Sequence, residues 1–141
     1  MSGAARGERL LRDFRRPWLW VAVWVLMLAA VIGGSLLPAR ELPPMPFTGF
    51  DKFQHFFGYA ALSGYAAMLF ARMRAQALAG AALVALGIGL EVAQGQWTGT
   101  RQPDLLDAVA NTAGVLAGML VAATPGAHWL QRFDARCLRR G

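Results

Sequence analysis

The residues best suited to chemistry begin with Asp51, Lys52 and His55, at the start of an apolar, aromatic segment. In a helix, Asp51 lies four positions and Lys52 three positions before His55, so the three side chains share one face. A neighbouring carboxylate can hold an imidazole in one tautomer, which would make His55 a general base oriented by Asp51. A nucleophile is less obvious, because Ser63 would lie about two turns from His55 and Tyr59 about one turn.

A second polar stripe lies near the C-terminal end of the sequence. Asp104, Asp107 and Asn111 follow one another at spacings of three and four, so a helix would place them on one face. The same face continues as Gly114 and Gly118. Because small residues let membrane helices approach closely, this face predicts tight packing against a neighbouring helix below a polar head.

The elements that must position these residues are long apolar helices. The 141 residues are 56% hydrophobic and only 16% charged, whereas soluble domains are roughly 25% charged. About 20 apolar residues suffice to cross a bilayer. We therefore predict an all-α integral membrane bundle in a single domain, 1–141. The expected transmembrane helices are 17–37, 52–71, 75–96 and 104–123, followed by a cytoplasmic tail over 124–141.

Two features of the sequence refine this prediction. The apolar run after Pro17 exceeds the 7–15 residues of a typical signal-peptide core, and no clear cleavage site follows, so we expect an uncleaved anchor. Cys137 is the single cysteine, which excludes an internal disulfide.

Arginines set the expected orientation, because short cytoplasmic loops of membrane proteins retain positive residues. With four spans, the side opposite the termini receives only Arg40, Lys52 and Arg101. We therefore expect both termini to be cytoplasmic and the protein to lie in the plasma (inner) membrane. The net charge of +6 belongs to residues that bracket the spans, so we do not expect nucleic-acid binding. The arginines on the side of the termini are Arg6, Arg9, Arg12, Arg15, Arg16, Arg72, Arg74, Arg132, Arg136, Arg139 and Arg140.

This topology brings all the polar segments to the outer face of the membrane. Glu91 would lie about 24 Å along a helix that begins near Ala75, and therefore inside the outer edge of the hydrocarbon core. A carboxylate at that depth must face the bundle interior and find a partner, with Lys52, His55 and Arg101 as candidates. The expected cluster holds more carboxylates than fixed cations.

Three segments, DKFQHFFGYAAL, GLEVAQ and RQPDLLDAVANTAGVLAG, resemble the VanZ-like membrane protein family in their order and spacing. This family is named for an accessory protein of glycopeptide resistance. The resemblance covers about residues 17 to 123 and implies a small multi-helix membrane protein. The residues that match the family pattern are Asp51, Lys52, His55, Tyr59, Glu91, Gln94, Arg101, Asp104, Asp107, Asn111 and Gly114.

The function expected from these residues is a site at the outer face that binds or modifies a cell-envelope lipid or a glycopeptide-related ligand. Lys52 and Arg101 would hold an anionic head group, the first as a point charge and the second as a planar fork. The alternative is a structural or assembly protein in which the polar residues only join helices. The expected ligand-binding residues are Lys52, His55, Tyr59, Glu91, Gln94, Arg101, Asp104, Asp107 and Asn111.

Catalysis and metal binding are further hypotheses. The candidate catalytic residues are His55, Glu91 and Asp51, with Glu91 as the acid. A metal site would use Asp51, His55, Glu91 and Asp107, but no short motif such as H-E-x-x-H is present. We therefore expect no metal and no cofactor. The expected partners are membrane lipids and a lipid-linked or phosphorylated envelope ligand, and a homo-oligomer is left open.

Overall fold

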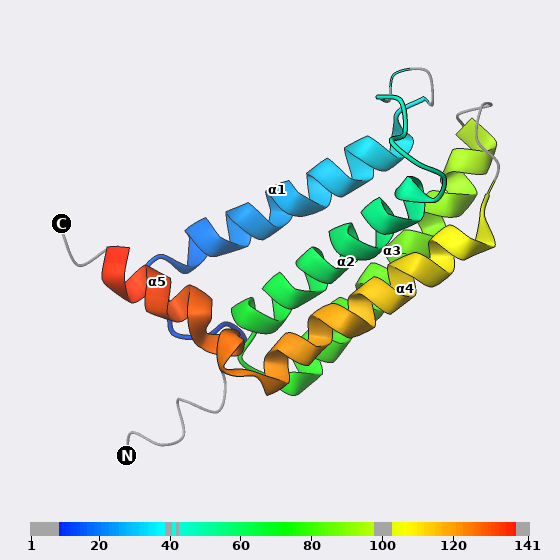
Figure 1. Ribbon diagram of the computed structural model, residues 1–141. Helices are drawn as coiled ribbons and strands as arrows, with labels where there is room; N and C mark the ends of the chain where they lie inside the picture. Colours follow the sequence, from blue (N-terminus) through cyan, green and yellow to red (C-terminus); the bar gives the residue numbers. More distant parts are fainter. Residues whose placement is uncertain (1–8, 39–40, 42, 98–102, 138–141) are drawn as a thin grey trace, which may run out of the picture.

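The computed structural model describes residues 9–38, 41, 43–97 and 103–137, and their regular structure is helical (Figure 1). The all-α class expected from the sequence is confirmed. Two 3₁₀ turns, Leu120–Ala123 and Pro125–His128, connect the last two α-helices. The α-helices are α1 (Pro17–Leu36), α2 (Phe50–Leu69), α3 (Met73–Trp97), α4 (Leu105–Met119) and α5 (Trp129–Cys137).

Within the described part of the chain, three segments are long and apolar enough to cross a membrane, namely Pro17–Leu36, Met73–Trp97 and Leu105–Ala123. The chain therefore has the make-up of a multi-pass helical membrane protein. The sequence predicted four spans, and α2 is the predicted span that does not reach the required mean hydropathy. Its first turn is polar, and it contains small and polar aromatic residues. Yet α2 is 20 residues long, runs alongside the other three long helices and packs against each of them.

The closest helix pair is α2 with α4, and glycines of α4 make the approach possible. A Cβ atom on Gly114 would overlap the carbonyl oxygen of Phe56, and one on Gly118 would overlap that of Ala60. Backbone thus lies against backbone, as expected for a small-residue stripe. The packing role predicted for these glycines is confirmed.

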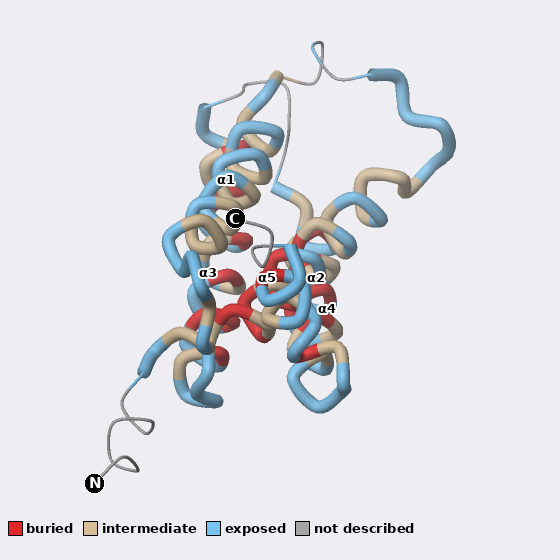
Figure 2. The backbone as a smooth tube through the Cα atoms, turned by 90° about the vertical axis from the view of Figure 1, so that its left-hand side faces the viewer, coloured by how far each residue is buried: buried red, intermediate tan, exposed pale blue. Residues whose placement is uncertain are grey.

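The core of the bundle forms around this helix pair. Tyr59 and Leu62 of α2 meet Leu83 of α3 and Val115 of α4, and all four side chains are buried. Figure 2 shows the buried residues gathered in the middle of the bundle and the exposed ones on its outside. By contrast, α1 has no buried residue, so its apolar side chains are at least partly exposed on all sides of the helix.

Tryptophan and tyrosine side chains join α1 to the rest. The indole N–H of Trp24 donates to the carbonyl of Leu62 at 3.0 Å, and the hydroxyl of Tyr65 donates to the carbonyl of Trp20 at 3.1 Å. Near the C-terminal end of α1, the side-chain amide of Gln94 in α3 donates to the carbonyl of Ser35 at 2.6 Å. These hydrogen bonds add to the packing of Met27, Leu28 and Val31 of α1 against the core.

The described arginines gather at one end of the molecule. The segment before α1, the turn between α2 and α3, and α5 lie together there, whereas the end of α3 and the start of α4 lie at the other end (Figure 1). The buried carboxylate of Asp134 in α5 accepts from the backbone N–H of Arg15 and the indole of Trp20, at 2.6 and 2.9 Å. The predicted tail therefore contains a helix that is fastened to the N-terminal segment.

Candidate functional site

The described polar residues predicted from sequence meet at the end of the bundle that lies away from the described arginines. The first turns of α2, the last turns of α3 and the start of α4 each contribute side chains. The α4 contribution is fixed by its N-cap, because Asp104 Oδ1 accepts from the backbone N–H of Leu106 at 2.8 Å. We call the following residues the polar cluster: Asp51, Lys52, His55, Glu91, Asp104, Asp107 and Asn111.

Lys52 is enclosed by carboxylates of the chain itself. Its Nζ lies 2.8 Å from Asp104 Oδ2, 3.2 Å from Asp51 Oδ2 and 3.2 Å from Asp107 Oδ1. The Lys52 ammonium, followed by the N–H of Leu106, holds the pKa of Asp104 below its ordinary value. Because three carboxylates of the chain already pair with the Lys52 ammonium, binding of an anionic head group by Lys52, as predicted from the sequence, is less favourable.

His55 is oriented by α4. Its Nδ1 lies 2.9 Å from Asn111 Oδ1, and its Nε2 lies 3.8 Å from Asp107 Oδ2. The carboxylate next to the imidazole is therefore Asp107, whereas the ion-pair partner of Asp51 is Lys52. The hypothesis of a general base oriented by Asp51 is corrected accordingly, because the close approach of α4 places a nearer carboxylate beside the ring.

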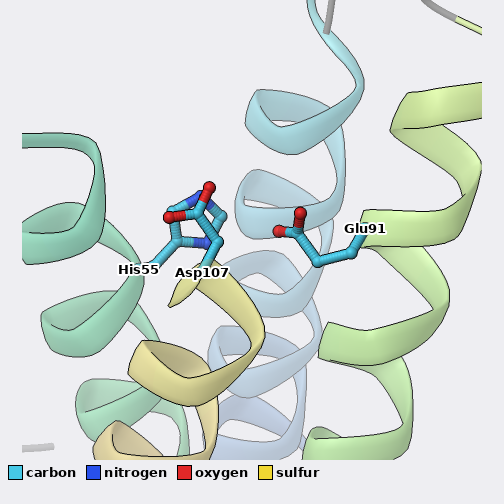
Figure 3. Close-up of side chains that lie close together, drawn as sticks. All are labelled: His55, Glu91 and Asp107. Atoms are coloured by element: carbon cyan, nitrogen blue, oxygen red, sulfur yellow. The ribbon is translucent and has the colours of Figure 1, made fainter. Parts of the chain in front are cut away.

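Glu91 completes the cluster from α3. Its side chain is buried, and its Oε2 accepts from the backbone N–H of Asp104 at 3.3 Å. Figure 3 shows the carboxylates of Glu91 and Asp107 and the ring of His55 turned toward one another. Ligand atoms of these three residues all lie within 4.8 Å of one another, and so do those of Asp51, Asp104 and Asp107. The second group surrounds Lys52, so a cation already occupies it.

The remaining predicted residues lie at the edge of this arrangement. Tyr59 is only 1% exposed, and its hydroxyl has no hydrogen-bond partner among the residues that the structure describes. Gln94 is buried and reaches α1 through Ser35. Arg101 lies outside the described residues.

A cavity of about 210 Å³ opens between α1 and α2 beside the cluster. One water molecule has a share of roughly 30 Å³ in the liquid, so the cavity is large enough for a polar group of several atoms. Ser35 and Gln54 were not predicted from the sequence. No periodic signal could have found Ser35, because its position in the wall depends on the register of an α1 helix that is apolar on all sides. The lining residues are Ala30, Val31, Gly34, Ser35, Asp51, Gln54, His55, Gly58 and Tyr59.

The charge of the site is negative over the described residues. Asp51, Glu91, Asp104 and Asp107 supply four carboxylates, and Lys52 is their one fixed cation. Such an arrangement suits hydroxyl donors and cations better than a bare anion.

Comparisons with family models, curated proteins and solved structures find no match for this chain. The class of protein is therefore stated from the helices themselves, as a multi-pass helical membrane protein with a polar site at one end. The resemblance of three sequence segments to VanZ-like proteins stays a prediction.

Replacing Lys52 with Met tests the electrostatic description of the cluster. We expect Lys52→Met to lower the free energy of unfolding by about 1–3 kcal/mol, because three carboxylates would face one another without their cation. Adding Asp104→Asn should recover part of that loss. Denaturant unfolding of the purified protein, followed by circular dichroism, measures the change.

Arg74→Met serves as the matched control, since Arg74 is exposed at the opposite end. We expect it to change the free energy by no more than about 0.5 kcal/mol. A Lys52→Met variant as stable as the wild type would contradict the description.

Proposed function

We propose that α2 spans the membrane together with α1, α3 and α4, with the arginine-rich end in the cytoplasm and the polar cluster at the outer face of the plasma membrane. All four helices run alongside one another. Eight described arginines lie in the segments at one end: Arg9, Arg12, Arg15, Arg16, Arg72, Arg74, Arg132 and Arg136. Retention of positive residues in the cytoplasm supports this orientation.

At that outer face, the protein binds the head group of a cell-envelope lipid in the cavity between α1 and α2. The observation that carries this proposal is a cavity in the side of an apolar bundle whose wall includes the polar side chains of Asp51, Gln54 and His55. A polar wall facing hydrocarbon is unfavourable unless water or a polar group fills it. A lipid head group meets this requirement while its acyl chains stay in the bilayer.

The attachment of α1 supports access from the side. Helix α1 has no buried residue, and small residues on both walls, Gly34 of α1 and Gly58 of α2, keep the cavity open. An acyl chain can therefore lie along α1 while its head group reaches Asp51 and Gln54. Carboxylate and amide oxygens accept hydrogen bonds from hydroxyl groups, which favours a head group that bears hydroxyls, such as a glycerol or a sugar.

Binding is favoured over catalysis because Ser63, one of the two nucleophiles considered from the sequence, is engaged away from the cluster. The Ser63 hydroxyl donates to the carbonyl of Val115 at 2.8 Å, and the side chain is buried below the cluster. The resemblance to VanZ-like proteins favours an envelope lipid, or a lipid-linked precursor, as the ligand. The alternative, a cluster that only joins helices, is favoured by the three ion pairs of Lys52.

Cys137 offers a native test of orientation, because it is the single cysteine and is exposed in α5. In spheroplasts, a membrane-impermeant maleimide should leave the wild-type protein unlabelled until the membrane is permeabilised. Thr48→Cys in a Cys137→Ser background should be labelled without permeabilisation, since Thr48 is exposed in the α1–α2 connection. The reverse pattern of labelling would overturn the orientation.

Filling the cavity tests the ligand proposal. No atom lies within 4 Å of a Cβ added at Gly34, so Gly34→Leu should fold and place its side chain in the cavity. We expect it to weaken binding of phosphatidylglycerol at least tenfold. Binding is measured by native mass spectrometry of the purified protein, with phosphatidylcholine as the lipid that lacks head-group hydroxyls.

Gly33→Leu is the matched control, because its Cβ is equally unobstructed and Gly33 does not line the cavity. It makes the same gain in helix propensity. Equal binding by the two variants would count against the cavity as the lipid site and in favour of the structural alternative.

A further inference from the structure

The side chains of His55, Glu91 and Asp107, which we call the triad, form a compact set of metal-ligand types. They come from α2, α3 and α4, and their ligand atoms lie within 4.8 Å of one another (Figure 3). Ligands at about 2.0–2.2 Å from an ion lie roughly 3 to 3.5 Å apart. Small side-chain rotations therefore suffice to close the triad around one ion.

The hydrogen bond of His55 on its far side orients the ring as a ligand. With Asn111 Oδ1 as acceptor, the proton of the neutral ring lies on Nδ1, at 2.9 Å from that oxygen. The lone pair of Nε2 then faces Asp107 Oδ2 at 3.8 Å. Two acceptors that face each other require a cation between them, and a hydrogen bond from the far ring nitrogen is typical of metal-bound histidine.

The two oxygens of Asp107 face different neighbours. Its Oδ1 pairs with Lys52 at 3.2 Å, which leaves Oδ2 on the side of His55. The side chains of His55 and Asp107 are 13% and 11% exposed, and Glu91 is 4% exposed. Two buried carboxylates beside an imidazole are ligand types that a divalent transition-metal ion uses.

Tyr59 provides an independent observation. Its phenol lies one turn from His55 and within Coulombic reach of Glu91, and its hydroxyl is fully buried with no hydrogen-bond partner in the described part of the chain. Buried hydroxyl groups are normally hydrogen-bonded. A water molecule on an ion in the triad would give Tyr59 the partner that it lacks.

We propose that His55 Nε2 and the carboxylates of Glu91 and Asp107 bind one divalent transition-metal ion, with Zn²⁺ preferred. An imidazole nitrogen beside carboxylates favours Zn²⁺ over Mg²⁺ or Ca²⁺, which prefer oxygen alone. Three protein ligands leave a fourth position for water or an exchangeable group. This departs from the expectation of no metal, because a motif search within one helix cannot find ligands supplied by three.

An ion in the triad would also favour a phosphate-bearing ligand in the cavity. His55 lines the cavity, so an ion held by the triad would lie beside the space proposed for the head group. Lys52 is occupied by carboxylates, and the ion would supply the positive charge that a phosphate needs. The binding of the ion stands on the triad alone, whereas its contact with a lipid phosphate rests on the proposed function.

Zinc titration of untagged protein tests the site. The protein is purified in detergent, stripped with EDTA, and titrated calorimetrically with Zn²⁺ and separately with Mg²⁺. We expect one Zn²⁺ per chain and at least tenfold weaker binding of Mg²⁺. Glu91→Gln and Asp107→Asn should each weaken Zn²⁺ binding at least tenfold, because each loses a charged ligand with little change in shape.

Asp134→Asn is the matched control, since it removes a buried carboxylate at the opposite end. It should bind Zn²⁺ within threefold of the wild type. Absence of Zn²⁺ binding by the wild type would overturn the proposal and assign the cation between His55 and Asp107 to a proton. Loss of binding in Asp51→Asn, with Glu91→Gln unaffected, would also overturn it by assigning the ion to the other carboxylates.

A Co²⁺ spectrum of the wild-type protein tests the same ligand set if a variant fails to fold. Visible bands of a low-symmetry nitrogen and oxygen site should appear with one equivalent and disappear on adding Zn²⁺, and a spectrum of aqueous Co²⁺ alone would overturn the proposal.

The two proposals fail separately. Zn²⁺ binding without phosphatidylglycerol binding overturns the lipid function alone, whereas undiminished lipid binding by a protein that binds no Zn²⁺ overturns the metal site alone.

Discussion

The close approach of α4 to α2 is the constraint on which the rest of the structure depends. Gly114 and Gly118 leave no room for a Cβ atom against the carbonyl groups of α2. Because side chains on one helical face repeat at three and four residues, the same face of α4 places Asn111 and Asp107 against His55 and Lys52. Packing in the apolar half of the helix pair thus sets the distances in the polar half.

The electrostatics of the cluster follow from that approach. Lys52 meets carboxylates from its own helix and from α4, and its charge is shared among them. Glu91, from α3, adds a buried carboxylate close to His55 and Asp107. The cluster therefore joins three helices.

The sequence predicted those features that depend on one helix at a time. The bounds of α1 and α3 agree with the expected 17–37 and 75–96 within two residues, because their apolar runs end at polar or proline-rich segments. The predicted 104–123 helix tightens into a 3₁₀ turn at Leu120–Ala123. The stripe of Asp107, Asn111 and Gly114 is buried as its spacing indicated.

Features that depend on how helices face one another could not be predicted. Asp51 and His55 share a helical face, but the carboxylate that approaches the His55 ring is Asp107 of α4. Gln94 donates to a backbone carbonyl of α1. The uniform apolar composition of α1 does not indicate its register against α3. The mean hydropathy of α2 is too low for a candidate span, because a central helix faces protein on several sides and can carry polar residues there.

The central claim is that the polar cluster is a binding site at one end of a membrane bundle. A density map of the protein purified with its native membrane lipids tests it most directly. The account predicts head-group density between α1 and α2 beside Gln54 and a strong peak joining His55, Glu91 and Asp107. An α1 helix closed onto α2, with no head group in the cavity and the His55 ring in direct hydrogen-bond contact with Asp107, would contradict it.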